Sequence, residues 1–142
     1  HDHGVWRSWA SQESDGDWSE ARTDLYLQGQ GVLDGLPENP GGFAWYRLET
    51  TVPQGVDRLM FPGLFNEAWL YIDGRLWAHR EQKPLWWTND YTFEWDVDLS
   101  GLSAGHHNFV LRTPVTEHFA GMFRRPFFYE GTRVEEKNAA EQ

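Results

Sequence analysis

Hydrophobic and polar side chains alternate with a period of two along much of the chain. The clearest case is residues 91–97, where Tyr91, Phe93, Trp95 and Val97 fall on one face and polar side chains fall on the other. A period of two places successive side chains on opposite faces of a β-strand. No amphipathic helix of three turns stands out, so the pattern predicts an all-β protein.

Short runs rich in aromatic and β-branched residues, bounded by Gly, Pro or Asp, predict the individual strands. The pair Asp73-Gly74 is a two-residue hairpin signal, so the runs on either side of it are expected to pair. We expect eight or nine short strands, which favours a β-sandwich or jelly roll. The predicted strands cover residues 43–52, 58–61, 67–72, 75–80, 91–97, 108–113 and 122–134, the last of them broken by Pro126 and Gly131, with weaker candidates at 6–10 and 18–23.

The length of the chain, 142 residues, suits one domain that buries a core without cross-links. The sequence has no cysteine, which excludes disulfides and cysteine-based metal sites. We expect a single domain over residues 1–134 and a polar tail over 135–142. Residues 26–42 contain five glycines and two prolines, a composition typical of a surface loop.

The formal net charge of −10 argues against nucleic acid and anionic membranes as partners, because both attract clustered Lys and Arg side chains. No apolar run approaches the roughly 18 residues of a membrane-spanning helix. The first residues, His1–Gly4, lack the basic and apolar stretches of a signal peptide. We therefore expect a chain from which such a peptide was removed, or a domain of a longer protein.

Six segments follow one another in an order typical of a known domain. They are the aromatic strand 43–47, the turn 61–65, the hairpin 69–74, and the segments 93–102, 105–112 and 121–124. In order and spacing they resemble the N-terminal sugar-binding-like domain of glycoside hydrolase family 2 enzymes, such as β-galactosidases and β-glucuronidases. The resemblance covers roughly residues 38–130 and implies a galactose-binding-like jelly roll.

In that family this domain holds neither the catalytic acid nor the nucleophile, so the resemblance implies a chain that is not an enzyme. The sequence departs from the family pattern at two places. Asp73 replaces the usual Asn, and Trp86-Trp87 stands where a Gly-Gly-Tyr loop is usual. These departures favour a stand-alone carbohydrate-binding module, appended to a polysaccharide-degrading enzyme and secreted or held at a bacterial cell surface.

Aromatic residues make up 16% of the chain and include nine Trp, more than one sandwich core needs, so some are expected to be exposed. A pyranose is recognised by stacking its C–H face on an aromatic ring, while planar polar groups bind its hydroxyls. The segment 79–90 contains both kinds of group. Its candidate carbohydrate-binding residues are Arg80, Trp86, Trp87, Asn89 and Asp90.

The resemblance adds three candidates, because two further loops approach the sugar in the family. They are Asn39 in one loop, and Glu117 and His118 in the other. Ordinary alternatives exist for each: Asn-Pro commonly starts a turn, and 116–119 also fits a solvated loop. The expected partners are a polysaccharide or oligosaccharide and a neighbouring catalytic domain.

No cofactor is expected, although a structural calcium ion stays open as an alternative. Asp15-Gly16-Asp17 resembles part of a calcium loop but lacks its later Glu. The pair His106-His107 follows a turn and is expected to be exposed. Trp45, Trp69 and Trp95 lie in alternating strands, and at least one of them is expected in the core.

Two other functions remain as alternatives. The first is a structural accessory domain of a larger glycosidase or lyase, which packs on its neighbour and binds no sugar by itself. The second is a glycosidase, which needs a pair of carboxylates. Glu67 and Glu94 each stand alone in the sequence, so no motif favours the enzyme.

Overall fold

The computed structural model describes residues 7–11, 19–20, 43–82, 93–114 and 121–131. Eleven strands lie in these residues, and all pairs between them are antiparallel. Two of the strands have only two residues each, so the expected eight or nine strands agree with the number of longer ones. The all-β prediction is confirmed.

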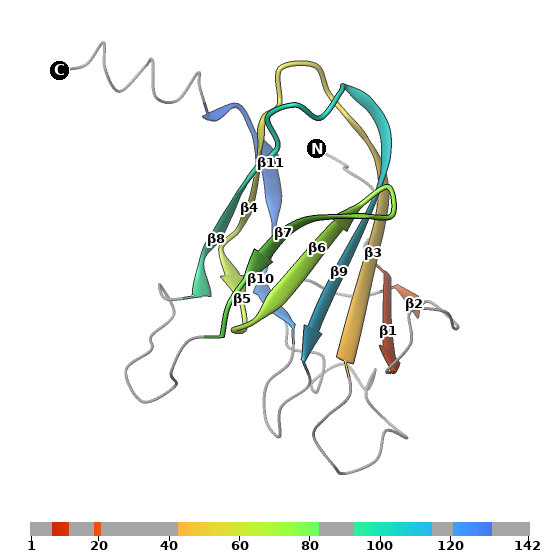
Figure 1. The fold of residues 1–142 in the computed structure, drawn as a ribbon, viewed down its shortest axis with the longest axis vertical. Coiled ribbons are helices and arrows are strands. Elements are labelled where there is room, and N and C mark those ends of the chain that lie inside the picture. The colour runs from red at the N-terminus through yellow and green to blue at the C-terminus, as the bar shows by residue number, and fades with distance from the viewer. Residues whose placement is uncertain (1–6, 12–18, 21–42, 83–92, 115–120, 132–142) are drawn as a thin grey trace, which may run out of the picture.

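A six-stranded sheet forms one layer of the sandwich, in the order β2-β1-β3-β9-β6-β7 (Figure 1). Its long central strands pair over their whole length, and the hairpin β6–β7 closes one edge. The members are β1 (Arg7–Ser11), β2 (Ser19–Glu20), β3 (Phe43–Val52), β6 (Ala68–Ile72), β7 (Arg75–Arg80) and β9 (Gly105–Pro114).

The opposite layer consists of two smaller sheets, β11-β4-β8 and β10-β5. Figure 1 shows these strands behind and beside the six-stranded sheet, as expected for a sandwich. They are β4 (Arg58–Phe61), β5 (Gly63–Leu64), β8 (Trp95–Asp98), β10 (Met122–Arg124) and β11 (Phe127–Tyr129).

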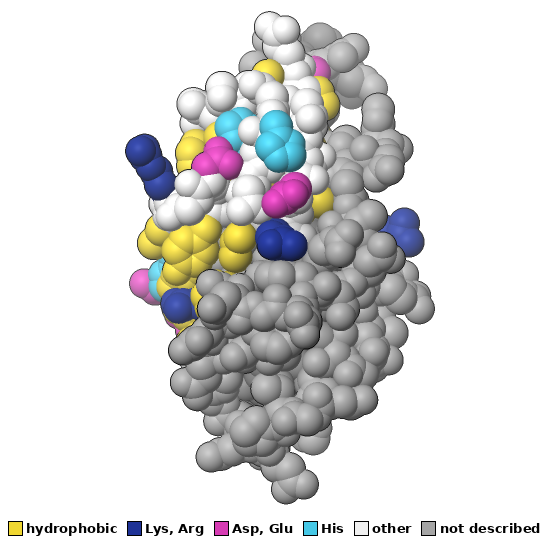
Figure 2. Space-filling model, turned by 90° about the vertical axis from the view of Figure 1, so that its right-hand side faces the viewer, with side chains coloured by type: hydrophobic (Ala, Val, Ile, Leu, Met, Phe, Trp, Pro, Cys, Tyr) yellow, Lys and Arg dark blue, Asp and Glu magenta, His cyan; other side chains and the backbone are white. Residues whose placement is uncertain are grey.

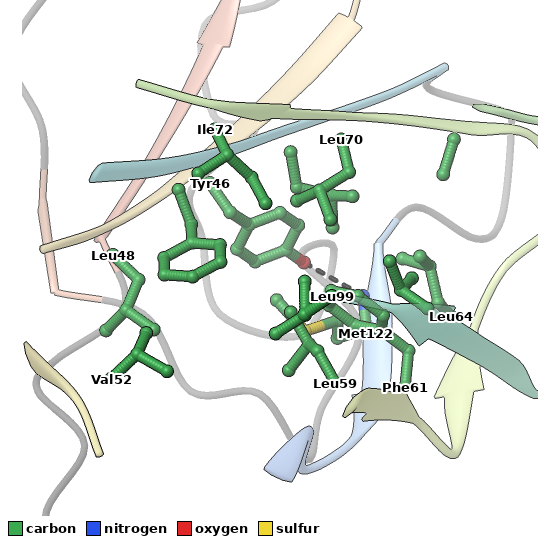
Figure 3. Close-up of a cluster of buried hydrophobic side chains, with 14 of the residues drawn as sticks. Tyr46, Leu48, Val52, Leu59, Phe61, Leu64, Leu70, Ile72, Leu99 and Met122 are labelled. Atoms are coloured by element: carbon green, nitrogen blue, oxygen red, sulfur yellow. Dashed lines mark hydrogen bonds between the residues drawn. The ribbon is translucent and has the colours of Figure 1, made fainter. Parts of the chain in front are cut away.

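The core lies between the two layers and follows the alternation of each strand. In β6 and β9 the buried side chains are those of alternate residues, and the same holds in β3 except that Trp45, on the other face, is buried as well. Burial of this apolar surface is the main force that holds the layers together. Figure 3 shows the cluster, whose members include Tyr46, Leu48, Leu59, Phe61, Leu70, Phe109, Leu111 and Met122.

Tyr46 spans the core from β3 to β10. Its hydroxyl accepts a hydrogen bond from the backbone N–H of Met122 at 3.0 Å (Figure 3). Burial raises the pKa of this phenol well above its usual value. Gly121 has a φ of +83°, and a Cβ there would lie 1.9 Å from the Tyr46 hydroxyl. The close approach therefore requires a glycine at this position.

Some details of the strand prediction differ from the structure. The run predicted over 122–134 is interrupted at Pro126 as expected, because proline provides no N–H for a continuous ladder, but its two parts, β10 and β11, belong to different sheets. Of the strand predicted over 91–97, the structure describes residues 93–97, and within these the strand begins at Trp95. The turn predicted at Pro62-Gly63 leads directly into the short strand β5.

Candidate functional site

The structure describes one of the eight predicted site residues, Arg80. The other seven lie outside the described residues: Asn39, Trp86, Trp87, Asn89, Asp90, Glu117 and His118. The same is true of Asp15 and Asp17, the fragment that left a calcium ion open. These assignments therefore stay predictions.

The strands that border the predicted binding segments can be located. Segment 21–42 precedes Phe43, the first residue of β3, and segment 115–120 follows Pro114, the last residue of β9. Phe43 and Pro114 are opposite each other in the β3–β9 pair. Segment 83–92 follows the end of β7 at Arg80, whose partner Ala68 begins β6. All these strand ends lie at the lower end of the sheet in Figure 1. Each of the three segments therefore adjoins a strand of the six-stranded sheet at the same end of the sandwich.

Arg80 is buried, with 8% of its surface exposed. Its guanidinium donates to three backbone carbonyl oxygens: Nε to Asn66 at 2.6 Å, one terminal nitrogen to Phe93 at 3.0 Å, and the other to Leu64. Burial lowers its pKa to about 10, so the group stays charged at neutral pH. The side chain expected to bind sugar hydroxyls thus bonds to the protein backbone.

The outer face of the six-stranded sheet carries a row of aromatic and basic side chains, which we call the outer row. It consists of Trp45, Arg112, Trp69 and His79, which are neighbours in register across β3, β9, β6 and β7. Each outer-row residue pairs directly with the next, an arrangement in which cross-strand side chains interact strongly. His79 Nε2 also lies 2.9 Å from a carboxylate oxygen of Glu67.

Both ring faces of Trp69 are covered within the outer row. The guanidinium of Arg112 lies 4.2 Å from the ring centre, and the His79 ring stacks at 4.8 Å with an angle of 11° between the planes. Arg112 and His79 come from strands on opposite sides of β6, so they cover opposite faces. Trp69 therefore has no free face on which a sugar ring could stack.

The other Trp side chains that the structure describes are also engaged. Trp45 is only 8% exposed, although it points away from the core. Trp77 donates its Nε1–H to the carbonyl of Asp98 at 2.8 Å and packs against the core. Trp95 stacks on Phe61 and packs on the core cluster, as expected for at least one strand Trp. Much of the aromatic content thus serves the fold.

His107 corrects a prediction, because it is 7% exposed rather than exposed like its neighbour His106. Its Nδ1 lies 2.5 Å from Asp73 Oδ2, and its Nε2 lies 2.6 Å from the Ser103 carbonyl. Both partners are acceptors, so only the imidazolium donates to both. The hydrogen bond to Asp73 raises the pKa of His107.

Figure 2 draws the side of the molecule that carries β1 and β3 in Figure 1. It shows hydrophobic side chains gathered beside Lys or Arg, with histidine and acidic side chains next to one another above them. Within the described residues, no group of three His, Asp or Glu side chains is arranged to hold a metal ion. No helix in this part of the chain is long and apolar enough to cross a membrane.

Several solved structures that match this fold are glycosidases. A glycosyl hydrolase family 2 member from Bacteroides cellulosilyticus matches 89% of this chain with a TM-score of 0.61 and 14% identity. A family 2 β-galacturonidase from Eisenbergiella tayi matches 82% with a TM-score of 0.56 and 18% identity. A β-glucuronidase from Faecalibacterium prausnitzii matches 78%, with a TM-score of 0.56 and 15% identity.

The chain spans only about a fifth of each of these enzymes: 20%, 18% and 20% of their respective lengths. No protein-family model matches the chain, and no curated protein matches it in sequence. Structural matches at such low sequence identity establish the fold but do not establish an activity. The chain therefore has the fold of a domain of glycoside hydrolase family 2 enzymes, as the resemblance implied.

Proposed function

We propose that this chain is a non-catalytic carbohydrate-binding module, appended to a polysaccharide-degrading enzyme, with a polysaccharide or oligosaccharide as its ligand. One observation carries the proposal: each of the three predicted binding segments adjoins a strand end, at Phe43, Pro114 or Arg80, and these three strand ends lie at the same end of the sandwich. Loops that leave a rigid scaffold at one end are a common way to build a binding site. A secreted or cell-surface bacterial location belongs to the proposal, since the polymer lies outside the cell.

In this proposal the Trp86 and Trp87 side chains stack on sugar rings. The polar side chains that bind hydroxyls are Asn39, Asn89, Asp90, Glu117 and His118. The engaged state of Trp45, Trp69, Trp77 and Trp95 supports this division, because these four rings already serve the fold. Arg80 leaves the set of sugar ligands, since its guanidinium is buried and bonded to carbonyl oxygens.

The proposal that the module is not catalytic rests on the size of the match. Enzymes with this fold contain about four-fifths of their length outside the matching part. Within the described residues, a carboxylate oxygen of Glu67 lies 2.9 Å from His79 Nε2. Hydrolysis of a glycosidic bond needs two carboxyl groups across the bond, and no sequence motif pairs Glu67 with Glu94.

A structural accessory domain is the second candidate, and a specific observation favours it. Leu76 and Phe127 are large hydrophobic side chains that are 56% and 46% exposed, and they lie on different sheets. Exposed apolar side chains of this kind also suit contact with a neighbouring domain. In that case the module packs on a catalytic domain and binds no sugar alone.

Affinity electrophoresis in gels that contain galactomannan, glucuronoxylan or polygalacturonate tests the proposal. We expect at least one polymer to retard the chain, and Trp86→Ala or Trp87→Ala to abolish the retardation. Phe127→Ala is the matched control, because it removes an exposed aromatic ring from another surface and should leave retardation unchanged.

Three outcomes contradict the proposal. Unchanged retardation in both Trp variants would show that Trp86 and Trp87 are not the rings on which the sugar stacks. No retardation in any gel, together with tight binding to the adjacent domain of the parent protein, favours the accessory domain. Release of reducing ends from any of the three polymers by the isolated chain would show that it is an enzyme.

A further inference from the structure

Two arginines of the six-stranded sheet differ in how their guanidinium groups are satisfied. Arg80, at the end of β7, donates to three backbone carbonyl oxygens. Arg112, on the outer face of β9, is half-buried, and its buried Nε has no hydrogen-bond partner. Among the residues that the structure describes, no carboxylate forms an ion pair with Arg112. The described part of the fold therefore leaves this guanidinium without an acceptor.

Aromatic rings surround the Arg112 guanidinium in place of acceptors. Its central carbon lies 4.2 Å from the ring centre of Trp69, 4.6 Å from that of Phe43 and 5.7 Å from that of Trp45. Distances within about 6 Å are those of cation–π contacts. Phe43 and Trp69 also pack edge to face, with ring centres 6.0 Å apart. The three rings hold the cation in place, but they do not satisfy its N–H donors.

The acidic side chain next to the outer row is already engaged elsewhere. A carboxylate oxygen of Glu67 lies 2.9 Å from His79 Nε2, and the His79 ring covers the face of Trp69 that is opposite Arg112. A guanidinium that is partly removed from water needs acceptors, and a carboxylate fits its planar fork with two parallel hydrogen bonds. A carboxylate from outside the chain would supply what the site lacks.

The position and the charge of the site narrow the ligand. Arg112 stands two residues before Pro114, and Phe43 is the first residue of β3, so the site lies near the end of the sandwich that the predicted binding segments adjoin. The net charge of −10 repels a densely charged polyanion. Charges more than about 8 Å apart are largely screened at physiological salt, so this repulsion has little effect on one isolated carboxylate.

We propose that Arg112, held by Phe43, Trp45 and Trp69, binds the carboxylate of a uronic acid residue, and that the ligand is a mainly neutral polysaccharide with isolated uronic acid groups. That the ligand is a polysaccharide rests on the proposed function, whereas its acidic group is inferred from Arg112. Because both faces of Trp69 are covered, this ring positions the guanidinium and does not stack on sugar.

Affinity electrophoresis of the full chain in three gels tests the proposal. The gels contain glucuronoxylan, the same polymer with its carboxylates reduced to alcohols, or polygalacturonate. We expect the dissociation constant for glucuronoxylan to be about tenfold lower than for the reduced polymer, the change that corresponds to one hydrogen-bonded charge pair. Polygalacturonate should bind more weakly than glucuronoxylan per carboxylate, because its charges are dense.

Arg112→Met removes the donors and keeps an unbranched side chain against the rings. It should bind both forms of glucuronoxylan equally, with the affinity that the unaltered chain has for the reduced polymer. Arg112→Lys should keep part of the preference, because an ammonium has the charge but not the planar fork. Arg124→Met is the matched control: it also removes one positive charge beside an aromatic ring, Phe123, but in β10 of the opposite layer. It should keep the full preference.

Melting temperatures separate binding from a structural role. Arg112→Met should lower the melting temperature no more than Arg124→Met does, because methionine packs well against aromatic rings and the fold loses no described hydrogen bond. A fall as large as that of Arg80→Met would assign the guanidinium to the fold and overturn the proposal.

Other results would overturn it as well. Equal binding of the two forms of glucuronoxylan by the unaltered chain would show that no carboxylate is recognised, while the proposed function stands. Tighter binding of polygalacturonate per carboxylate would show that the ligand is a dense polyanion. No retardation in any gel, with capture on a glutamate-rich peptide that Arg112→Met abolishes, would assign the site to a protein partner and would count against the proposed function too.

Discussion

The two ends of the β6–β7 hairpin are each held by one charged side chain, and they differ in almost every other respect. At the closed end, Asp73 accepts hydrogen bonds from the backbone N–H of Asn108 and from His107, with 49% of its side chain exposed. At the open end, Arg80 is buried and donates to three carbonyls. An exposed anion beside a histidine responds to pH, whereas a buried guanidinium stays charged.

The difference shows where the fold depends on a single residue. The closed end has a turn of its own, with φ values of +52° at Asp73 and +83° at Gly74, so the hairpin forms there from local geometry. The open end has no such local turn, and its geometry depends on partners from β5 and from the residue before β8. The comparison predicts that substituting the charged side chain lowers the free energy of unfolding strongly at the open end and only slightly at the closed end.

The largest expected effect is that of Arg80→Met. It leaves three carbonyl oxygens without their donors in a buried place, and each buried unsatisfied polar group costs about 1–3 kcal/mol. We expect the free energy of unfolding to fall by about 3 kcal/mol, measured by urea denaturation followed by tryptophan fluorescence. If the free energy of unfolding falls by less than about 1 kcal/mol, the carbonyl oxygens find other partners, and the open end depends on its charged side chain no more than the closed end does.

The pH dependence of stability should come from the closed end. The pKa of His107 lies above its ordinary value of 6.5, so its contribution is present below pH 6.5 and is lost as the pH rises through the raised value. The pKa of Asp73 lies below 3.8, so its contribution is present above pH 3.8 and is lost as the pH falls through the lowered value. The pair therefore stabilises the fold most between about pH 4 and 6.5.

His107→Gln should remove most of this pH dependence, with a loss of about 1 kcal/mol or less at pH 5.5, because half of the Asp73 side chain is in water. Melting temperatures of the variant and the unaltered chain from pH 4 to 9 measure it. His106→Gln, at the exposed neighbouring position, is the matched control. Equal pH profiles for His107→Gln and the unaltered chain would contradict the assignment.

The smallest expected effect is that of Asp73→Asn. Asparagine also tolerates a positive φ, and its side-chain oxygen still accepts the bond from the Asn108 backbone. We expect a loss of about 0.5 kcal/mol at pH 5.5, together with a lower His107 pKa that NMR titration of the imidazole would detect. If the variant is as unstable as Arg80→Met, the closed end is not formed by local geometry.

The same contrast explains which features the sequence revealed. The strand over 43–52 was predicted with its observed limits and the Asp73-Gly74 hairpin to within one residue, because turn chemistry and side-chain alternation are local properties. Pro126 also marked the break between β10 and β11 within 122–134. Nothing local specified that the two parts join different sheets.

The candidate site was less predictable than the fold. Arg80 stood next to a Trp-rich segment, and an Arg near aromatic residues suggests a ligand contact as readily as a structural one. Only the positions of the Leu64, Asn66 and Phe93 carbonyls show that its guanidinium is engaged. His107 is a similar case, since one of its two hydrogen-bond partners, Asp73, lies 34 residues away in the chain.

By itself the sequence determined an all-β sandwich, most of its strands, the hairpin turn and the resemblance to a glycoside hydrolase family 2 domain. These follow from periodicity, turn residues and the order of motifs, which act over a few residues at a time. The tertiary structure alone decided which face each aromatic ring offers and which backbone groups each charge meets. Burial and hydrogen bonding depend on segments that are distant in sequence, so the covered faces of Trp69 and the carbonyl partners of Arg80 emerge only when the strands pack.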